Sequence, residues 1–118
     1  METLAREIYE WCMKNDLWHD CCIYFNGKAW ASWDTWHDED GKEIDKCLYE
    51  YEDRNPKEYF EYANPDTLSM SFEGPLYHVL NAYVPGWIAT TEEFGDIFRK
   101  HGYYYELGHA WNLSVYEI

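Results

Sequence analysis

The sequence predicts an α+β domain: a mainly antiparallel sheet of hairpins, packed with an N-terminal helix and two helices in the C-terminal half. Two hairpin signals, Asn26-Gly27 and Asp40-Gly41, are flanked by aromatic and β-branched residues. Apolar residues recur at helical spacing near the N-terminus and again between residues 75 and 101. The chain of 118 residues has no internal repeat, so we expect residues 1–118 to form one domain.

The first predicted element is an amphipathic helix over residues 3–15. Its apolar face consists of Leu4, Ile8, Trp11 and Cys12. Thr3 is a suitable N-cap, and Asn15-Asp16 ends the pattern. We expect the apolar face of this helix to pack on the sheet.

Three antiparallel strands follow, over residues 20–25, 28–38 and 43–53. A two-residue turn at each hairpin signal fixes which residues lie opposite one another. The first turn predicts the pairs Phe25–Lys28, Ile23–Trp30 and Cys21–Ser32, and the second predicts Asp34–Cys47, Ser32–Tyr49 and Trp30–Tyr51.

Alternation along these strands divides their side chains between two faces. One face should hold Cys21, Ile23, Phe25, Trp30, Trp36, Cys47, Tyr49 and Tyr51. The other should hold Cys22, Tyr24, Ala29, Ala31, Trp33, Ile44, Leu48, Glu50 and Glu52. The small Ala29 and Ala31 would let a helix approach this second face. Glu50 and Glu52 would then lie at its solvated margin, because burying an unpaired carboxylate is costly. A slip of one residue in register would exchange the faces.

The segment Glu58–Ala63 allows two interpretations. Asn55-Pro56 followed by Glu58 could open a short helix. Alternatively, the turn signal at residues 64–67 joins this segment to the alternating strand at residues 68–73 as a third hairpin. We favour the hairpin.

Two helices and two strands complete the chain. Pro75 suits the first position of a helix that Pro85-Gly86 stops, and its apolar face consists of Leu76, Val79, Leu80 and Tyr83. Thr90 and Glu93 form a capping box for a second helix, which ends before Gly102. Strands are expected over residues 103–107 and 110–116.

The charge balance predicts the kind of partner. Nine basic residues against 23 acidic residues give a net charge of −14, which disfavours direct binding to nucleic acid or anionic membranes. Such a charge favours a basic protein surface. Residues 34–66 alone contain twelve acidic and four basic residues. The alternative is that the acidic charge only keeps the protein soluble.

Recognised catalytic and cofactor patterns are missing from the sequence. Soft metal ligands are present as Cys12, His19, Cys21, Cys22, His37 and Cys47. However, no C-x₂-C pair occurs, so we expect packing roles for the cysteines and no metal. The glycines form no phosphate-binding motif, and no serine lies in a nucleophile elbow. We therefore expect no enzymatic activity, no catalytic residues and no cofactor.

Targeting signals are also missing. The N-terminal sequence METLAREIYEW is charged where a secretion signal would be apolar, and no apolar run reaches the length of a membrane span. Four cysteines without a secretion signal suggest reduced thiols. We expect the protein to be cytoplasmic.

The acidic second hairpin is the predicted partner-binding site, through Asp34, Asp38, Glu39, Asp40, Glu43, Asp45, Glu50 and Glu52. In size and charge the chain resembles anti-CRISPR and anti-restriction proteins of phages, and immunity proteins that neutralise nuclease toxins. This resemblance implies an inhibitor that occupies a basic, nucleic-acid-binding surface of a partner such as a nuclease. The alternative is a non-enzymatic ligand-binding or regulatory domain in which aromatic residues line a pocket.

Overall fold

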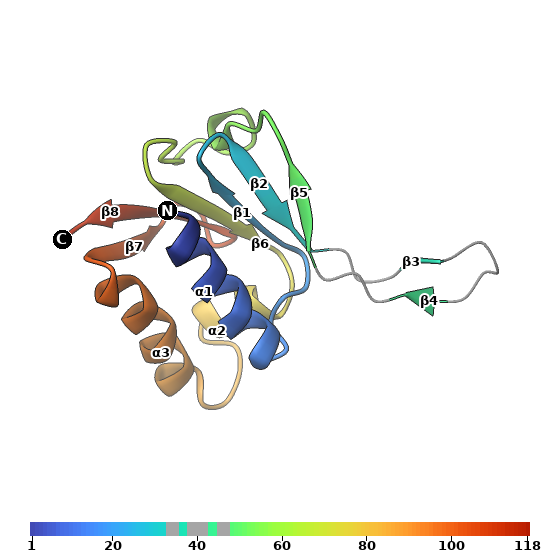
Figure 1. Ribbon diagram of the computed structural model, residues 1–118. Helices are drawn as coiled ribbons and strands as arrows, with labels where there is room; N and C mark the ends of the chain where they lie inside the picture. Colours follow the sequence, from blue (N-terminus) through green and yellow to red (C-terminus); the bar gives the residue numbers. More distant parts are fainter. Residues whose placement is uncertain (33–35, 38–42, 45–47) are drawn as a thin grey trace.

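The computed structural model describes residues 1–32, 36–37, 43–44 and 48–118. In chain order the elements are α1 (Glu2–Lys14), β1 (Cys21–Phe25), β2 (Lys28–Ala31), β3 (Trp36–His37), β4 (Glu43–Ile44), β5 (Tyr49–Tyr51), the 3₁₀ helix η1 (Pro56–Glu58), β6 (Leu68–Phe72), α2 (Pro75–Leu80), α3 (Trp87–Lys100), β7 (Tyr103–Leu107) and β8 (Asn112–Glu117). Six strands form an antiparallel sheet in the order β5-β2-β1-β6-β8-β7, and β3 pairs with β4 in a separate sheet (Figure 1). The predicted α+β class is confirmed.

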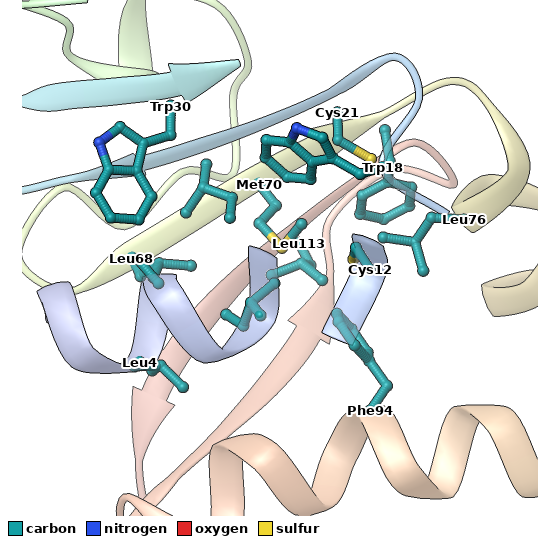
Figure 2. Packing of buried hydrophobic residues seen from close by; sticks show 14 of the residues in the cluster. Leu4, Cys12, Trp18, Cys21, Trp30, Leu68, Met70, Leu76, Phe94 and Leu113 are labelled. Carbon is teal, nitrogen blue, oxygen red and sulfur yellow. The ribbon is translucent and has the colours of Figure 1, made fainter. Parts of the chain in front are cut away.

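The three α-helices lie together against one face of the six-stranded sheet (Figure 1). The core forms between them, and Figure 2 shows Leu4 and Cys12 of α1 and Phe94 of α3 lying close to the sheet residues Met70 and Leu113. These five side chains are at most 2% exposed. Burial of apolar area between helices and sheet therefore supplies most of the stabilisation.

The N-terminal helix forms as predicted, with bounds shifted by one residue. Leu4, Ile8 and Cys12 are buried at the predicted spacing, and Ala5 joins them. Met1 rather than Thr3 occupies the N-cap position, with no side-chain hydrogen bond.

The first hairpin is confirmed in its register. Ile23 lies opposite Trp30, and Phe25 lies opposite Lys28. Asn26 and Gly27 have φ angles of 50° and 74°, as a type I′ turn requires.

The register predicted for the second hairpin is wrong by one residue. Trp30 lies opposite Glu50 rather than Tyr51, and Tyr51 lies opposite Ala29. Farther out, His37 lies opposite Glu43, which leaves five residues between the paired positions. A two-residue turn at Asp40-Gly41 requires an even number between paired positions, so the odd number agrees with the register observed at β5. Asp40 and Gly41 themselves lie outside the described residues.

The slip exchanges the faces of the residues in and beside β5. Tyr51 packs with Tyr24 and Ala29 on the face away from the helices, where the prediction had placed Glu50. Leu48 packs against the helix-side core instead. The faces predicted for Trp33, Trp36, Ile44 and Cys47 concern side chains outside the described part of the structure.

Contrary to the prediction, the α-helices that the structure describes lie on the other face of the sheet from Ala29 and Ala31. Residues 56–66 cover that face instead, and they begin with η1, whose N-cap Asn55 accepts a hydrogen bond from the Lys57 amide. The third hairpin is also wrong, since β6 already pairs with β1 on one edge and β8 on the other. Phe60 packs on the sheet face, against Tyr24 at a ring distance of 5.7 Å.

Hydrogen bonds hold this covering segment in place. The Ser114 hydroxyl of β8 donates to the Tyr62 carbonyl at 2.6 Å and lies 3.0 Å from the Ser69 hydroxyl. The Asn64 amide nitrogen Nδ2 donates to the Val115 carbonyl at 2.9 Å. Hydrogen bonds from polar side chains therefore help to attach this segment to the sheet, in addition to the packing of Phe60.

In the C-terminal half, α2 begins at Pro75 as predicted and buries Leu76 and Val79, whereas Tyr83 lies beyond its end and is exposed. The capping box predicted at Thr90 is wrong, because α3 begins at Trp87 after the left-handed Gly86 (φ 76°). The Thr90 hydroxyl donates to the Gly86 carbonyl one turn earlier, at 3.2 Å.

The two predicted C-terminal strands form as β7 and β8, and they pair with Tyr105 opposite Val115. Three aspartates adopt left-handed backbone conformations at chain reversals. These are Asp16 after α1 (φ 55°), Asp20 before β1 (φ 54°) and Asp53 after β5 (φ 53°).

Candidate functional site

The predicted acidic site is only partly described by the structure. Asp34, Asp38, Glu39, Asp40 and Asp45 lie outside the described residues. Glu43 lies in β4, opposite His37 of β3. Glu50 lies in β5, and Glu52 follows that strand.

The small β3–β4 sheet is separate from the rest of the fold. In Figure 1 it lies beyond the β5 edge of the six-stranded sheet, on the side away from β7 and β8. In the sequence, residues 38–45 contain five carboxylates and one lysine. Of this acidic stretch, Glu43 and Ile44 are described as β4, which pairs with β3 and not with the six-stranded sheet.

Glu50 is held by neighbours within the chain. Its carboxylate lies 2.9 Å from the Lys28 ammonium and accepts a hydrogen bond of 2.9 Å from the Trp30 indole nitrogen. These two contacts, first the indole and then the ammonium, lower the pKa of Glu50 below its usual value of 4.5. Because its charge is already compensated, Glu50 is a weaker candidate for a partner contact than sequence alone implied.

Glu52 has a different environment. Its side chain is exposed and forms no ion pair with any residue that the structure describes, although its backbone carbonyl accepts a hydrogen bond from Arg54 at 3.0 Å. The neighbouring Asp53 is exposed as well. This carboxylate pair thus remains available to a basic partner at the end of β5.

A groove lies on the face of the sheet away from the helices, which we call the open face. It lies beside β2 and β5, the strands that flank the β3–β4 sheet in the sequence. It has a volume of about 200 Å³ and is lined by Cys22, Tyr24, Ala29, Ala31, Tyr51, Arg54 and Tyr59. The Tyr24 and Tyr59 rings stack with centroids 5.5 Å apart, and the Arg54 guanidinium lies 5.3 Å from the Tyr51 ring centre.

Sequence reasoning missed Arg54 and Tyr59 in this groove. Tyr51 would have been assigned to it by the correct register, because Tyr51 pairs with Ala29. Arg54 and Tyr59 come from a segment with no periodic pattern, so only the folded chain brings them there.

The groove offers no activated nucleophile. Burial raises the pKa of the Cys22 thiol to about 11, so the thiol stays protonated at neutral pH. Burial also raises the pKa of the Tyr24 hydroxyl. The arrangement suits contact with an aromatic or planar group rather than covalent chemistry.

The other cysteines that the structure describes have packing positions. Cys12 and Cys21 lie in the helix-side core, whereas Cys22 faces the opposite side of β1, as predicted for adjacent strand residues. The Cys21 thiol donates to the Leu17 carbonyl at 3.4 Å. Within the described ranges, no three His, Cys, Asp or Glu side chains are grouped as a metal site requires.

Comparisons with known proteins add no family. A scan of protein-family models, a search of curated protein sequences and a search of solved structures each gave no significant match. Across the described residues, every helix is too short or too polar to cross a bilayer.

Proposed function

We propose that this chain is a small cytoplasmic protein-binding inhibitor whose acidic hairpin occupies a basic, nucleic-acid-binding surface of a partner such as a nuclease. The observation that supports this proposal most strongly is the separate β3–β4 sheet beyond β5, within the most acidic stretch of a chain of charge −14. Clustered carboxylates speed association with a basic surface and exclude competing anions from it.

The exposed carboxylates after β5 extend this surface toward the body of the protein. Glu52 and Asp53 precede Arg54, whose guanidinium lies against the Tyr51 ring in the groove. Acidic and aromatic groups are therefore neighbours here. Interfaces commonly combine a charged rim with aromatic anchors at their centre. The proposed partner contact therefore includes the hairpin and the β5 end of the open face.

The proposal is tested with reversed charges. Capture from a host-cell lysate identifies binding proteins, and the affinity of each purified protein is then measured for the wild-type chain and for the variant Asp38→Lys/Glu39→Lys/Asp40→Lys/Glu43→Lys. We expect association to slow about tenfold or more, with weaker dependence on salt. We also expect the wild-type chain and duplex DNA to exclude each other from the partner.

A matched control reverses four exposed carboxylates elsewhere, in Glu10→Lys/Asp66→Lys/Glu73→Lys/Glu93→Lys. Equal loss of binding in both variants would mean that net charge, not the hairpin, drives association. Unchanged binding in both would contradict the electrostatic proposal.

The tyrosine-lined groove supports a second candidate, a non-enzymatic module for small ligands. Its volume of about 200 Å³ is below the ~300–1,000 Å³ usual for ligand pockets. A groove of this size suits one side chain of a protein partner better than a free ligand. A small aromatic compound that binds tightly to the groove and leaves the hairpin unaffected would favour the second candidate.

A further inference from the structure

The sheet has a second distinctive region at its opposite edge, formed by β7. This strand is the last in the order β5-β2-β1-β6-β8-β7, and among the described strands its one partner is β8. It has five residues, whereas the edge strand β5 has three. Proteins commonly shorten, charge or cover such an edge, because its unpaired backbone groups recruit other strands.

The register shows which backbone groups of β7 point outward. The Ile118 amide donates to the Gly102 carbonyl at 3.1 Å, and the Gly108 amide donates to the Asn112 carbonyl at 3.1 Å. In an antiparallel ladder, hydrogen-bonded pairs alternate with pairs that do not exchange hydrogen bonds. Both ends of the ladder therefore assign the hydrogen-bonded positions to even-numbered residues of β7.

The odd-numbered residues consequently present their backbone groups to the outside. These are Tyr103, Tyr105 and Leu107, whose N–H and C=O groups point away from β8. Their spacing of two residues matches the spacing at which a further strand would pair. Of the five β7 side chains, only Glu106 carries a charge, and the strand contains no proline.

A groove runs beside this free edge, between β7 and α3. It has a volume of about 340 Å³ and is lined by Thr91, Glu92, Gly95, Arg99, Tyr104 and Tyr105. A side chain at position 95 would meet the Arg99 guanidinium, so Gly95 lets Arg99 lie against α3, and the buried Thr91 hydroxyl has no hydrogen-bond partner within the described structure. A groove between a helix and an exposed strand edge is the arrangement in which folded domains add a peptide strand.

We propose that β7 and the α3 groove form a strand-addition site for an extended, basic segment of a partner protein. Main-chain hydrogen bonds to Tyr103, Tyr105 and Leu107 would extend the sheet, and alternate side chains of the segment would enter the groove. The charges nearest the edge favour a basic segment, because Glu92 lines the groove and Glu106 is exposed on the strand, whereas Arg99 already pairs with Asp96.

A second copy of the chain fits this edge less well. Each copy carries a net charge of −14, so pairing two β7 strands would bring two strongly acidic molecules together. This site lies at the opposite end of the sheet from β5 and does not depend on the acidic hairpin.

Amide hydrogen exchange of the whole protein tests the proposal with a defined probe, the capped peptide Lys-Val-Thr-Val-Lys-Val-Thr. At saturating peptide we expect the exchange rates of the Tyr103, Tyr105 and Leu107 amides to fall by a factor of about ten or more. A peptide of the same sequence N-methylated at every residue, which has no amide donor on either edge, should give no protection. Equal protection by both peptides, or protection by neither, would overturn the proposal.

Two variants sharpen the test. Leu107→Pro removes an outward donor that makes no hydrogen bond to β8, and it should weaken peptide binding about tenfold, whereas Leu107→Ala should not. Glu106→Lys changes an exposed side chain only and should reverse the preference toward a peptide with glutamate in place of lysine. An unchanged preference in Glu106→Lys would contradict the assigned polarity of the segment.

Sedimentation of the unliganded protein completes the experiment. A monomer mass at all concentrations agrees with a site for a different chain. A concentration-dependent dimer whose β7 amides are protected would overturn the proposal in favour of self-association.

Discussion

The two faces of the six-stranded sheet are built on the same strands but closed by different means. On one face three helices bury a continuous apolar core that includes Phe94, Met70 and Leu113. On the other face a single irregular segment packs through Phe60 and is fixed by hydrogen bonds to Ser114. The helices bury their face of the sheet and leave a groove at its β7 margin, whereas the hydrogen-bonded segment leaves a groove lined by residues of β1, β2 and β5.

The largest expected effect separates the two faces by side-chain truncation. Phe94 is fully buried, with ring centres 4.9 Å from Phe98 and 5.2 Å from Tyr105. Phe94→Ala should lower the free energy of unfolding by about 3–5 kcal/mol. Phe60→Ala should cost less, because the segment that carries it can relax, and amide exchange should accelerate mainly in residues 56–66. Equal losses in denaturant unfolding would show that both faces belong to one cooperative core.

A smaller effect is expected from the hydrogen bonds of the open face. Ser114→Ala leaves the part-buried Tyr62 carbonyl without its donor, whereas the Ser69 hydroxyl keeps its hydrogen bonds to Asn64. The loss should be about 1–3 kcal/mol, measured as a shift of the unfolding midpoint. Thr90→Ala is the control, since its hydroxyl only donates to a carbonyl one turn earlier in α3. A comparable loss in this control would contradict the special role of the open-face network.

The smallest expected effect concerns pH and the β2–β5 edge. Glu50 has a lowered pKa when folded, so its charged form stabilises the fold above the usual pKa of 4.5, and this contribution is lost as the pH falls through the lowered value. Glu50→Gln should therefore lower the thermal midpoint slightly at neutral pH, and the difference from wild type should vanish in strong acid. Glu52→Gln, at an exposed carboxylate without an ion pair among the described residues, is the control and should leave the thermal midpoint at neutral pH unchanged.

Turn signals and periodic patterns predicted the elements whose geometry is determined by residues close together in the sequence. Asn26-Gly27 allows one tight turn, so the pairing of Ile23 with Trp30 followed from it. The spacing of Leu4, Ile8 and Cys12 likewise identified the buried side of α1. In each case neighbouring residues determine the outcome without knowledge of the remaining chain.

The wrong predictions depended on distant contacts. A turn signal that joins the segment containing Phe60 to β6 predicted a hairpin, but both edges of β6 are occupied by β1 and β8, which sequence alone did not reveal. The slip at β5 likewise placed Glu50 beside Trp30 and Tyr51 on the open face. Of the candidate sites, the sequence suggested only the acidic partner-binding site. The two grooves could not be predicted, because tertiary packing brings their lining residues together.

The left-handed aspartates change how the acidity of this chain should be interpreted. At Asp16, Asp20 and Asp53 the backbone reverses with positive φ, a conformation that aspartate tolerates better than most residues. Part of the carboxylate content therefore has a conformational use, separate from any electrostatic selection by a partner. Replacing these residues by glycine would keep the reversals and bring the chain closer to neutrality, whereas replacement by lysine would combine a charge effect with backbone strain.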